Sequence, residues 1–104
     1  MGEFQELVLL AIASLASDAY GVSIQDQIRR VAGRKISRGA LHSALLRLED
    51  KGYLSSHFGG STKERGGRSK RYYQLTRTGH LAVIEAKSIR EKFWNKIELT
   101  VSAQ

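Results

Sequence analysis

The chain has 104 residues, of which 41% are apolar, and this suffices for one compact domain with a single core. It contains no cysteine, which excludes disulfides, cysteine-ligated zinc and thiol catalysis. The formal net charge is +7, and the excess of lysine and arginine over acidic residues is concentrated in residues 34–80. An anionic partner is therefore the first expectation, and a solvated basic face is the alternative.

Catalytic and membrane functions have no support in the sequence. The three histidines fall on different predicted elements, and there is no nucleophile elbow, phosphate-binding loop or metal-spaced cluster. We therefore expect no enzyme activity, no metal and no cofactor. No apolar run approaches the roughly 18 residues needed to cross a bilayer, and residues 7–13 lack the basic leader of a signal peptide. The expected location is the cytoplasm.

Two helices are predicted in the first third of the chain. Residues 4–15 are almost continuously apolar, which is typical of a helix that is buried on much of its surface or shared with a partner chain. Ser17 and Asp18 are expected to end it and to cap the next helix. That second helix runs from Tyr20 to Val31, with apolar residues at steps of four and three, and ends at Gly33. Ile36 could then form a strand of one or two residues.

A third helix is predicted after Ser37, which is a favourable N-cap residue. Leu41, Ala44, Leu45 and Leu48 form one apolar stripe, and Gly52 ends the helix. The opposite face and its flanks are polar or basic, apart from one leucine. They carry Arg38, Gly39, His42, Ser43, Leu46, Arg47 and Asp50.

A β-hairpin and a last helix complete the predicted order. The strands cover residues 53–58 and 70–75, and the connection between them is rich in glycine. Thr76 is expected to cap a helix that runs to about Leu99. The predicted fold is thus mainly α with a small β hairpin, a winged helix-turn-helix followed by a C-terminal helix. We divide it into residues 1–78 and residues 79–104, with the second part packing on residues 4–16.

In a winged helix-turn-helix, the third helix enters the major groove of DNA and the hairpin, or wing, contacts the flanking backbone. The predicted recognition residues are Ser37, Arg38, Gly39, His42, Ser43 and Arg47. The predicted wing contacts are Lys63, Arg65, Arg68, Lys70 and Arg71. Tyr20, at the start of the second helix, is expected to contact a phosphate. Tyr73 and Leu75 are expected to fasten the wing to the core.

The sequence resembles the PadR family of bacterial transcriptional regulators from Leu7 to about Ala82. The resemblance is carried by Tyr20-Gly21, by the run Gly39-Ala40-Leu41-His42-x-x-Leu45-x-Arg47-Leu48-Glu49-x-x-Gly52, and by Lys70-Arg71-Tyr72-Tyr73-Gln74-Leu75-Thr76-x-x-Gly79. The family usually has tyrosine and proline where this chain has His42 and Ser43. The resemblance implies a homodimer that binds a palindromic operator on double-stranded DNA, generally as a repressor.

The resemblance also implies pairing through the C-terminal region, here in the short form with a single helix. The residues agree with this, because a lone helix with several large apolar side chains has little left inside the monomer to cover it. The predicted dimer interface consists of Leu7, Leu10, Ile89, Phe93, Trp94 and Ile97. A small, flat aromatic effector could bind at Phe93 and Trp94, although core packing is the simpler interpretation. The alternatives to a DNA-binding regulator are a basic winged-helix module that binds RNA and one that binds an acidic protein.

Overall fold

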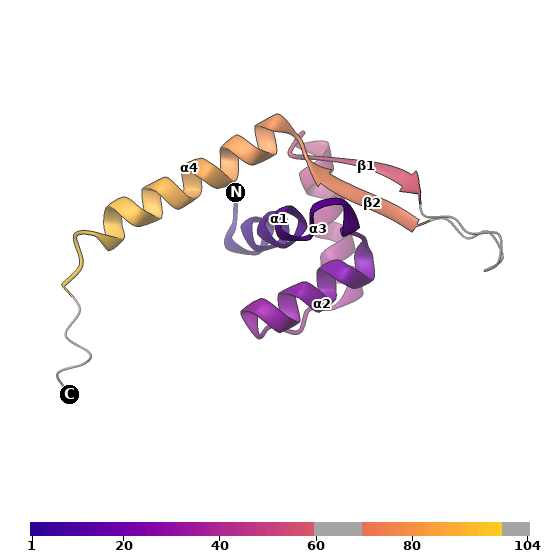
Figure 1. The fold of residues 1–104 in the computed structure, drawn as a ribbon, viewed down its shortest axis with the longest axis horizontal. Coiled ribbons are helices and arrows are strands. Elements are labelled where there is room, and N and C mark those ends of the chain that lie inside the picture. Colours follow the sequence, from indigo (N-terminus) through magenta and orange to yellow (C-terminus); the bar gives the residue numbers. More distant parts are fainter. Residues whose placement is uncertain (60–69, 99–104) are drawn as a thin grey trace.

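The computed structural model describes residues 1–59 and 70–98. In chain order the elements are α1 (Glu3–Leu15), a 3₁₀ turn (Ala16–Asp18), α2 (Gly21–Ala32), α3 (Arg38–Asp50), β1 (Leu54–Gly59), β2 (Lys70–Leu75) and α4 (Arg77–Trp94). Three helices and an antiparallel hairpin form the body, and α4 leaves it as a long arm (Figure 1). The predicted fold class, mainly helical with a two-stranded hairpin and a C-terminal helix, is confirmed.

The core lies around α1 and is built from the apolar stripes of the three body helices. Val8, Leu9 and Ile12 of α1 are almost completely buried. They meet one face each of α2, α3 and the hairpin, through Ile24, Ile28, Leu41, Ala44, Leu45, Leu48, Leu54, Tyr73 and Leu75. The predicted stripe of α3 is therefore confirmed. Val31 is 77% exposed, so its predicted place in the stripe of α2 was wrong; α2 ends at the next residue.

Local capping fixes where the helices start and stop. The Ser37 hydroxyl accepts a hydrogen bond from the Ala40 amide at 3.0 Å, and the Thr76 hydroxyl accepts one from the Gly79 amide at 3.0 Å. Gly52 follows α3 with a left-handed φ of 81°, as predicted. The prediction that Ser17 and Asp18 cap α2 was wrong. Tyr20 is the N-cap residue, and the Ser23 hydroxyl accepts a hydrogen bond from its amide.

The extended segment that pairs with the hairpin also differs from the prediction. Ile36 forms no strand, and its carbonyl accepts a hydrogen bond from the Gln25 side chain instead. The pairing segment lies just before α2, where Tyr20 forms an isolated bridge with Tyr72 and the Tyr73 amide donates to the Ala19 carbonyl at 2.8 Å. The hairpin is thereby tied to the start of α2.

The last helix leaves the body after its first few turns. Gly79 is buried and Val83 packs against the core, whereas all residues from Ile89 to Glu98 are exposed. The body and arm together span 58 × 30 × 22 Å. Helix α4 ends at Trp94, earlier than the predicted end near Leu99, which itself lies outside the described residues. In the described part of the chain, no helix is long and apolar enough to cross a membrane.

Candidate nucleic-acid interface

A groove joins the start of α2, the exposed face of α3 and the base of the wing. Its lining includes Tyr20, Arg38, His42 and Lys70. These residues come from three separate segments of the sequence, and each was predicted to contact DNA. Because helix packing and the Tyr20 bridge bring them together, one ligand could touch α2, α3 and β2 at once.

The outer face of α3 is fully available to a ligand. Arg38, His42, Ser43 and Arg47 are exposed, and their neighbours Leu41, Ala44, Leu45 and Leu48 are buried. A β-carbon at Gly39 would meet no atom within 4 Å, so this turn offers close access to the backbone. The Ser37 hydroxyl is already used as the N-cap of α3. Its contribution is therefore to hold the N-terminus of the helix in shape.

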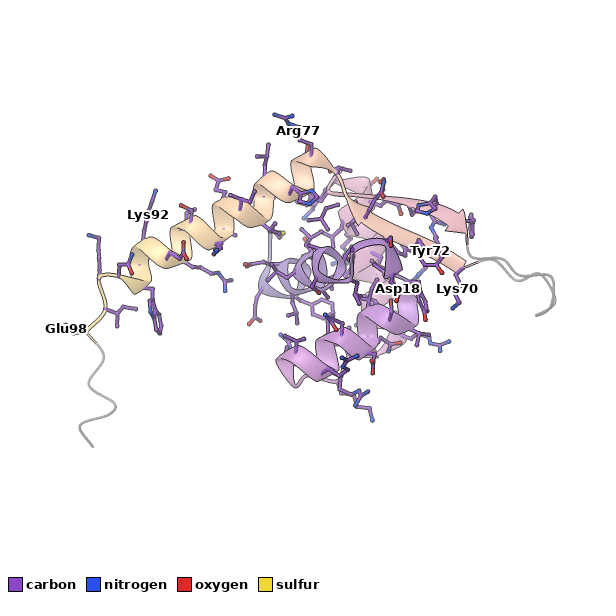
Figure 2. All side chains as sticks on the ribbon, in the orientation of Figure 1. Asp18, Lys70, Tyr72, Arg77, Lys92 and Glu98 are labelled. Atoms are coloured by element: carbon purple, nitrogen blue, oxygen red, sulfur yellow. The ribbon has the colours of Figure 1, made fainter. Side chains whose placement is uncertain are left out.

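Aromatic contacts fix the base of the wing against α2. The rings of Tyr20 and Tyr72 meet edge to face with centroids 5.6 Å apart, and the rings of His57 and Tyr72 stack at 5.9 Å. The Lys70 ammonium lies 4.2 Å from the centre of the Tyr20 ring. Figure 2 shows Lys70 and Tyr72 on β2, close in this view to Asp18 in the turn before α2. A cationic group is thus held beside the N-terminus of a helix.

Arg71 has a different environment from Lys70. Its guanidinium pairs with Glu49 of α3 at 3.4 Å, and its Nε donates to the Ser56 hydroxyl at 3.0 Å. The Ser56 hydroxyl in turn donates to Glu49. This network fastens β2 to α3. The geometry therefore favours a fastening role for Arg71, where the sequence predicted a DNA contact.

Neither Glu49 nor Ser56 was recognised as part of the site from the sequence. Glu49 is in the last turn of α3, and Ser56 is on β1, opposite Tyr73. Their meeting with Arg71 depends on the hairpin register and on the angle between the hairpin and α3. A serine and a glutamate seven residues apart carry no local signal of such a contact.

Tyr73 and Leu75 hold the wing from its inner side, as predicted. Both are buried, and they lie in register with Ser56 and Leu54 of β1. Burial raises the pKa of the Tyr73 phenol, which the nearby Arg71 guanidinium opposes. Since the ordinary pKa of tyrosine is already about 10, Tyr73 stays neutral under physiological conditions and acts as a packing residue.

The remaining predicted wing contacts, Lys63, Arg65 and Arg68, lie outside the described residues. In residues 1–59 and 70–98, no three histidine, cysteine or acidic side chains are placed to hold a metal ion. The described groove thus offers cations, aromatic rings and helix N-termini, which is the chemistry that binds nucleic-acid backbones.

Comparison with known families decides the identity. Residues 9–85 match the model of the transcriptional regulator PadR-like family. The chain belongs to this family. As a PadR-like transcriptional regulator it binds DNA, and it is not an enzyme. No curated protein sequence matches it.

Solved structures of transcriptional regulators share the fold of this chain. A PadR-like transcription factor from Bacteroides fragilis superposes with a TM-score of 0.75 at 22% identity, over 89% of this chain and 84% of the other. A PadR family regulator from Clostridium difficile gives 0.67 at 25% identity, over 89% and 92%. A transcriptional regulator from Clostridium thermocellum gives 0.66 at 26% identity, over 92% and 91%. Both the winged body and α4 are thus included in the similarity.

The arm of this PadR-like chain carries a row of exposed apolar side chains. Phe93 is 69% exposed and Trp94 60%. Ile89, Ile97 and, on α1, Leu10 are about half exposed, and Leu81 and Ile84, which lie outside the predicted interface, are 55% and 60% exposed. Leu7 differs from the other predicted interface residues, because it is half-buried and packs on the core of its own chain. A groove between α1 and α4 is lined by Leu10, Val83, Ile84 and Trp94.

Proposed function

We propose that this PadR-like regulator is a repressor that binds a two-fold symmetric operator in the cytoplasm as a homodimer. The observation that carries the proposal is the row of exposed apolar residues along α4. Large apolar patches on small soluble proteins mark association sites. Pairing with a second copy about a two-fold axis would bury the patch of both chains at once. It would also present two copies of α3 to one face of a duplex.

Within each half-site, the proposal assigns separate roles to α3 and to the groove. The N-terminal half of α3 reads bases in the major groove, where Arg38 and His42 are the principal candidates. Tyr20 and Lys70 hold a backbone phosphate at the start of α2. The complete set of proposed contacts comprises Arg38, Gly39, His42, Ser43 and Arg47 on α3, Tyr20 and Lys70 in the groove, and Lys63, Arg65 and Arg68 in the wing, while Ser37 caps α3 and holds its N-terminus in place.

In this proposal, the dimer represses transcription by occupying its operator. Half-sites read by a helix-turn-helix dimer are about 34 Å apart, one turn of the duplex. A dimer over such a site excludes other proteins from that stretch of promoter. A flat aromatic effector between the arms, next to Phe93 and Trp94, remains a prediction, supported by the apolar groove beside Trp94.

Selection from random double-stranded DNA tests this function. We expect the protein to enrich sites with two inverted half-sites, and we expect footprinting to show protection of both. Structured RNA of equal length, added as competitor, should displace the selected duplex only at a large molar excess. Enrichment of single half-sites would contradict the symmetric dimer. Equal competition by RNA would favour the RNA-binding alternative, and no protected site at all would favour a protein-binding module.

Disrupting the arm is expected to abolish dimerisation. The variant Phe93→Ser, Trp94→Ser removes two exposed aromatic side chains from the surface of α4, where they contribute little to the core of the monomer. Buried aromatic residues are the usual hot spots of interfaces, each contributing about 2 kcal/mol or more. Sedimentation equilibrium should therefore show a monomer at concentrations where the wild type is a dimer.

Val31→Ser is the matched control, because Val31 is the most exposed large apolar residue of the body and lies on α2. It should leave the dimer intact. A double variant that sediments as the wild type would place the interface elsewhere.

A further inference from the structure

Glu6 is the one buried charged residue in the described part of the chain. It lies in the first half of α1, between residues that pack into the core, and its side chain is 12% exposed. A buried carboxylate is costly unless it is paired and hydrogen-bonded. Its partner is Arg90 of α4, whose guanidinium donates to Glu6 Oε1 at 2.6 Å. The pair therefore joins the DNA-binding body to the arm across 84 residues of sequence.

Arg90 is the last residue of the described α4 that forms a hydrogen bond with the body. Apolar packing of α4 on the core involves the start of the helix, where Gly79 is buried and Val83 contacts the core. From Ile89 onward every described residue is exposed. Packing near Val83 anchors the base of the arm, and a second attachment is needed to fix its direction. The Glu6–Arg90 pair is in the right place to supply it.

The direction of the arm matters because the dimer is proposed to form along it. Helix α4 is about 27 Å long at 1.5 Å per residue. Over a lever of that length, a rotation of about 10° moves one end by about 5 Å, which exceeds the rise of one base pair, about 3.4 Å. Small changes in the angle between α1 and α4 would therefore change the separation of the two α3 helices by a base pair or more.

We propose that the Glu6–Arg90 pair sets the angle between the body and the arm, and thereby the spacing between half-sites that the dimer accepts. Both side chains are positioning residues, since neither lies in the groove that faces DNA. An ion pair suits this role better than apolar contact, because a charge-assisted hydrogen bond is directional. Its net contribution to stability is small, since the desolvation of Glu6 offsets much of the attraction. The inference rests on the proposed dimer.

The test uses the full chain and a set of duplexes that carry the selected half-sites with the spacer shortened or lengthened by one and two base pairs. Two variants break the pair, Arg90→Gln and Glu6→Leu. The second leaves no buried charge, and its freed partner is 64% exposed and stays solvated. Lys87→Gln is the matched control. Lys87 is on α4, like Arg90, and both line the groove between α1 and α4. The only salt bridge of Lys87 in the described structure is with Glu91, within α4 itself.

We expect the wild type and Lys87→Gln to lose about tenfold or more in affinity when the spacer changes by one base pair, a typical penalty for an imperfect site. Both pair-breaking variants should bind the altered spacers within about threefold of the original, and the double variant should behave like either single one because they remove the same contact. Sedimentation should show that the variants remain dimers.

Two results would overturn the proposal. One is an unchanged spacing profile in both variants. The other is a uniform loss of affinity for every spacer that parallels weakened dimerisation, which would make the pair a stabilising contact only. A wild-type protein that binds all spacers equally would instead refute the two-half-site function itself, and with it any role in spacing.

Discussion

Replacing Arg38 with alanine is expected to weaken binding to the selected operator by about 1–3 kcal/mol, roughly 5- to 150-fold. Arg38 is the first residue of α3 and lines the groove with Tyr20 and Lys70. Arginine that donates two hydrogen bonds to guanine is the commonest base contact in the major groove. Selection repeated with the variant should also show relaxed preference at one position of each half-site.

Arg30→Ala is the matched control for Arg38→Ala. Arg30 is equally cationic, but it lies in the last turn of α2, where it pairs with Asp26 at 3.3 Å. Hydrogen bonds from Arg29 and Arg30 lower the pKa of the Asp26 carboxyl, so this cluster carries its own counter-charge. The control should bind the operator within about twofold of wild type, as expected for a partly neutralised surface charge. Equal losses in both variants would mean that general charge, and not the α3 face, drives binding.

A contrasting result is expected for the wing. Replacing Arg65 and Arg68 together with glutamine should weaken binding to all sequences alike and lower the slope of log affinity against log salt by about 2, since each lost phosphate contact removes nearly one released counterion. Arg38→Ala should alter sequence preference more than the slope. Comparing the two variants over a salt series therefore separates base reading from phosphate binding.

The parts of the fold that the sequence predicted are those set by local chemistry. The caps at Ser37 and Thr76 depend on amides three residues away. The stripe on α3 depends only on helical periodicity. The same local logic placed Arg38 and His42 on the exposed face of α3, and the structure agrees.

The parts that the sequence did not predict are those that depend on packing between distant segments. The bridge from Tyr20 to Tyr72 requires the start of α2 to lie beside β2, which no local pattern specifies. Arg71 was expected to contact DNA from the wing, like Lys70. Only the hairpin register shows that its guanidinium pairs with Glu49 and donates a hydrogen bond to Ser56. Lys70 and Arg71 are adjacent basic residues on β2, and they have different roles because neighbouring side chains of a strand face opposite sides of the sheet.

Gly79→Ala is expected to destabilise the protein by about 2 kcal/mol, within the usual cost of overpacking. A β-carbon at position 79 would lie 2.1 Å from the carbonyl oxygen of Tyr53 and 3.1 Å from its carbonyl carbon. The obstacle is backbone, and it cannot rotate away as a side chain could. That carbonyl also accepts a hydrogen bond from the Thr76 amide at 3.0 Å, so a shift would disturb the junction between β2 and α4.

The resemblance to PadR proteins included Gly79 without giving a reason, and this close approach supplies one. Thermal unfolding followed by circular dichroism should show a fall in Tm of about 8–16 °C for a domain of this size. Gly39→Ala is the matched control, because a β-carbon there meets no atom within 4 Å. Alanine is also the better helix former, so the control should unfold at the same temperature as wild type or slightly higher.

All three proteins must be compared at one concentration, since dimerisation makes Tm depend on it. Equal unfolding temperatures for Gly79→Ala and wild type would show that α4 can move away from Tyr53 at no cost. The junction between β2 and α4 would then be loose, and the direction of the arm would depend on the packing at Val83 and on the Glu6–Arg90 pair alone. The stability of this one glycine variant therefore bears on the proposed control of half-site spacing as well as on the fold.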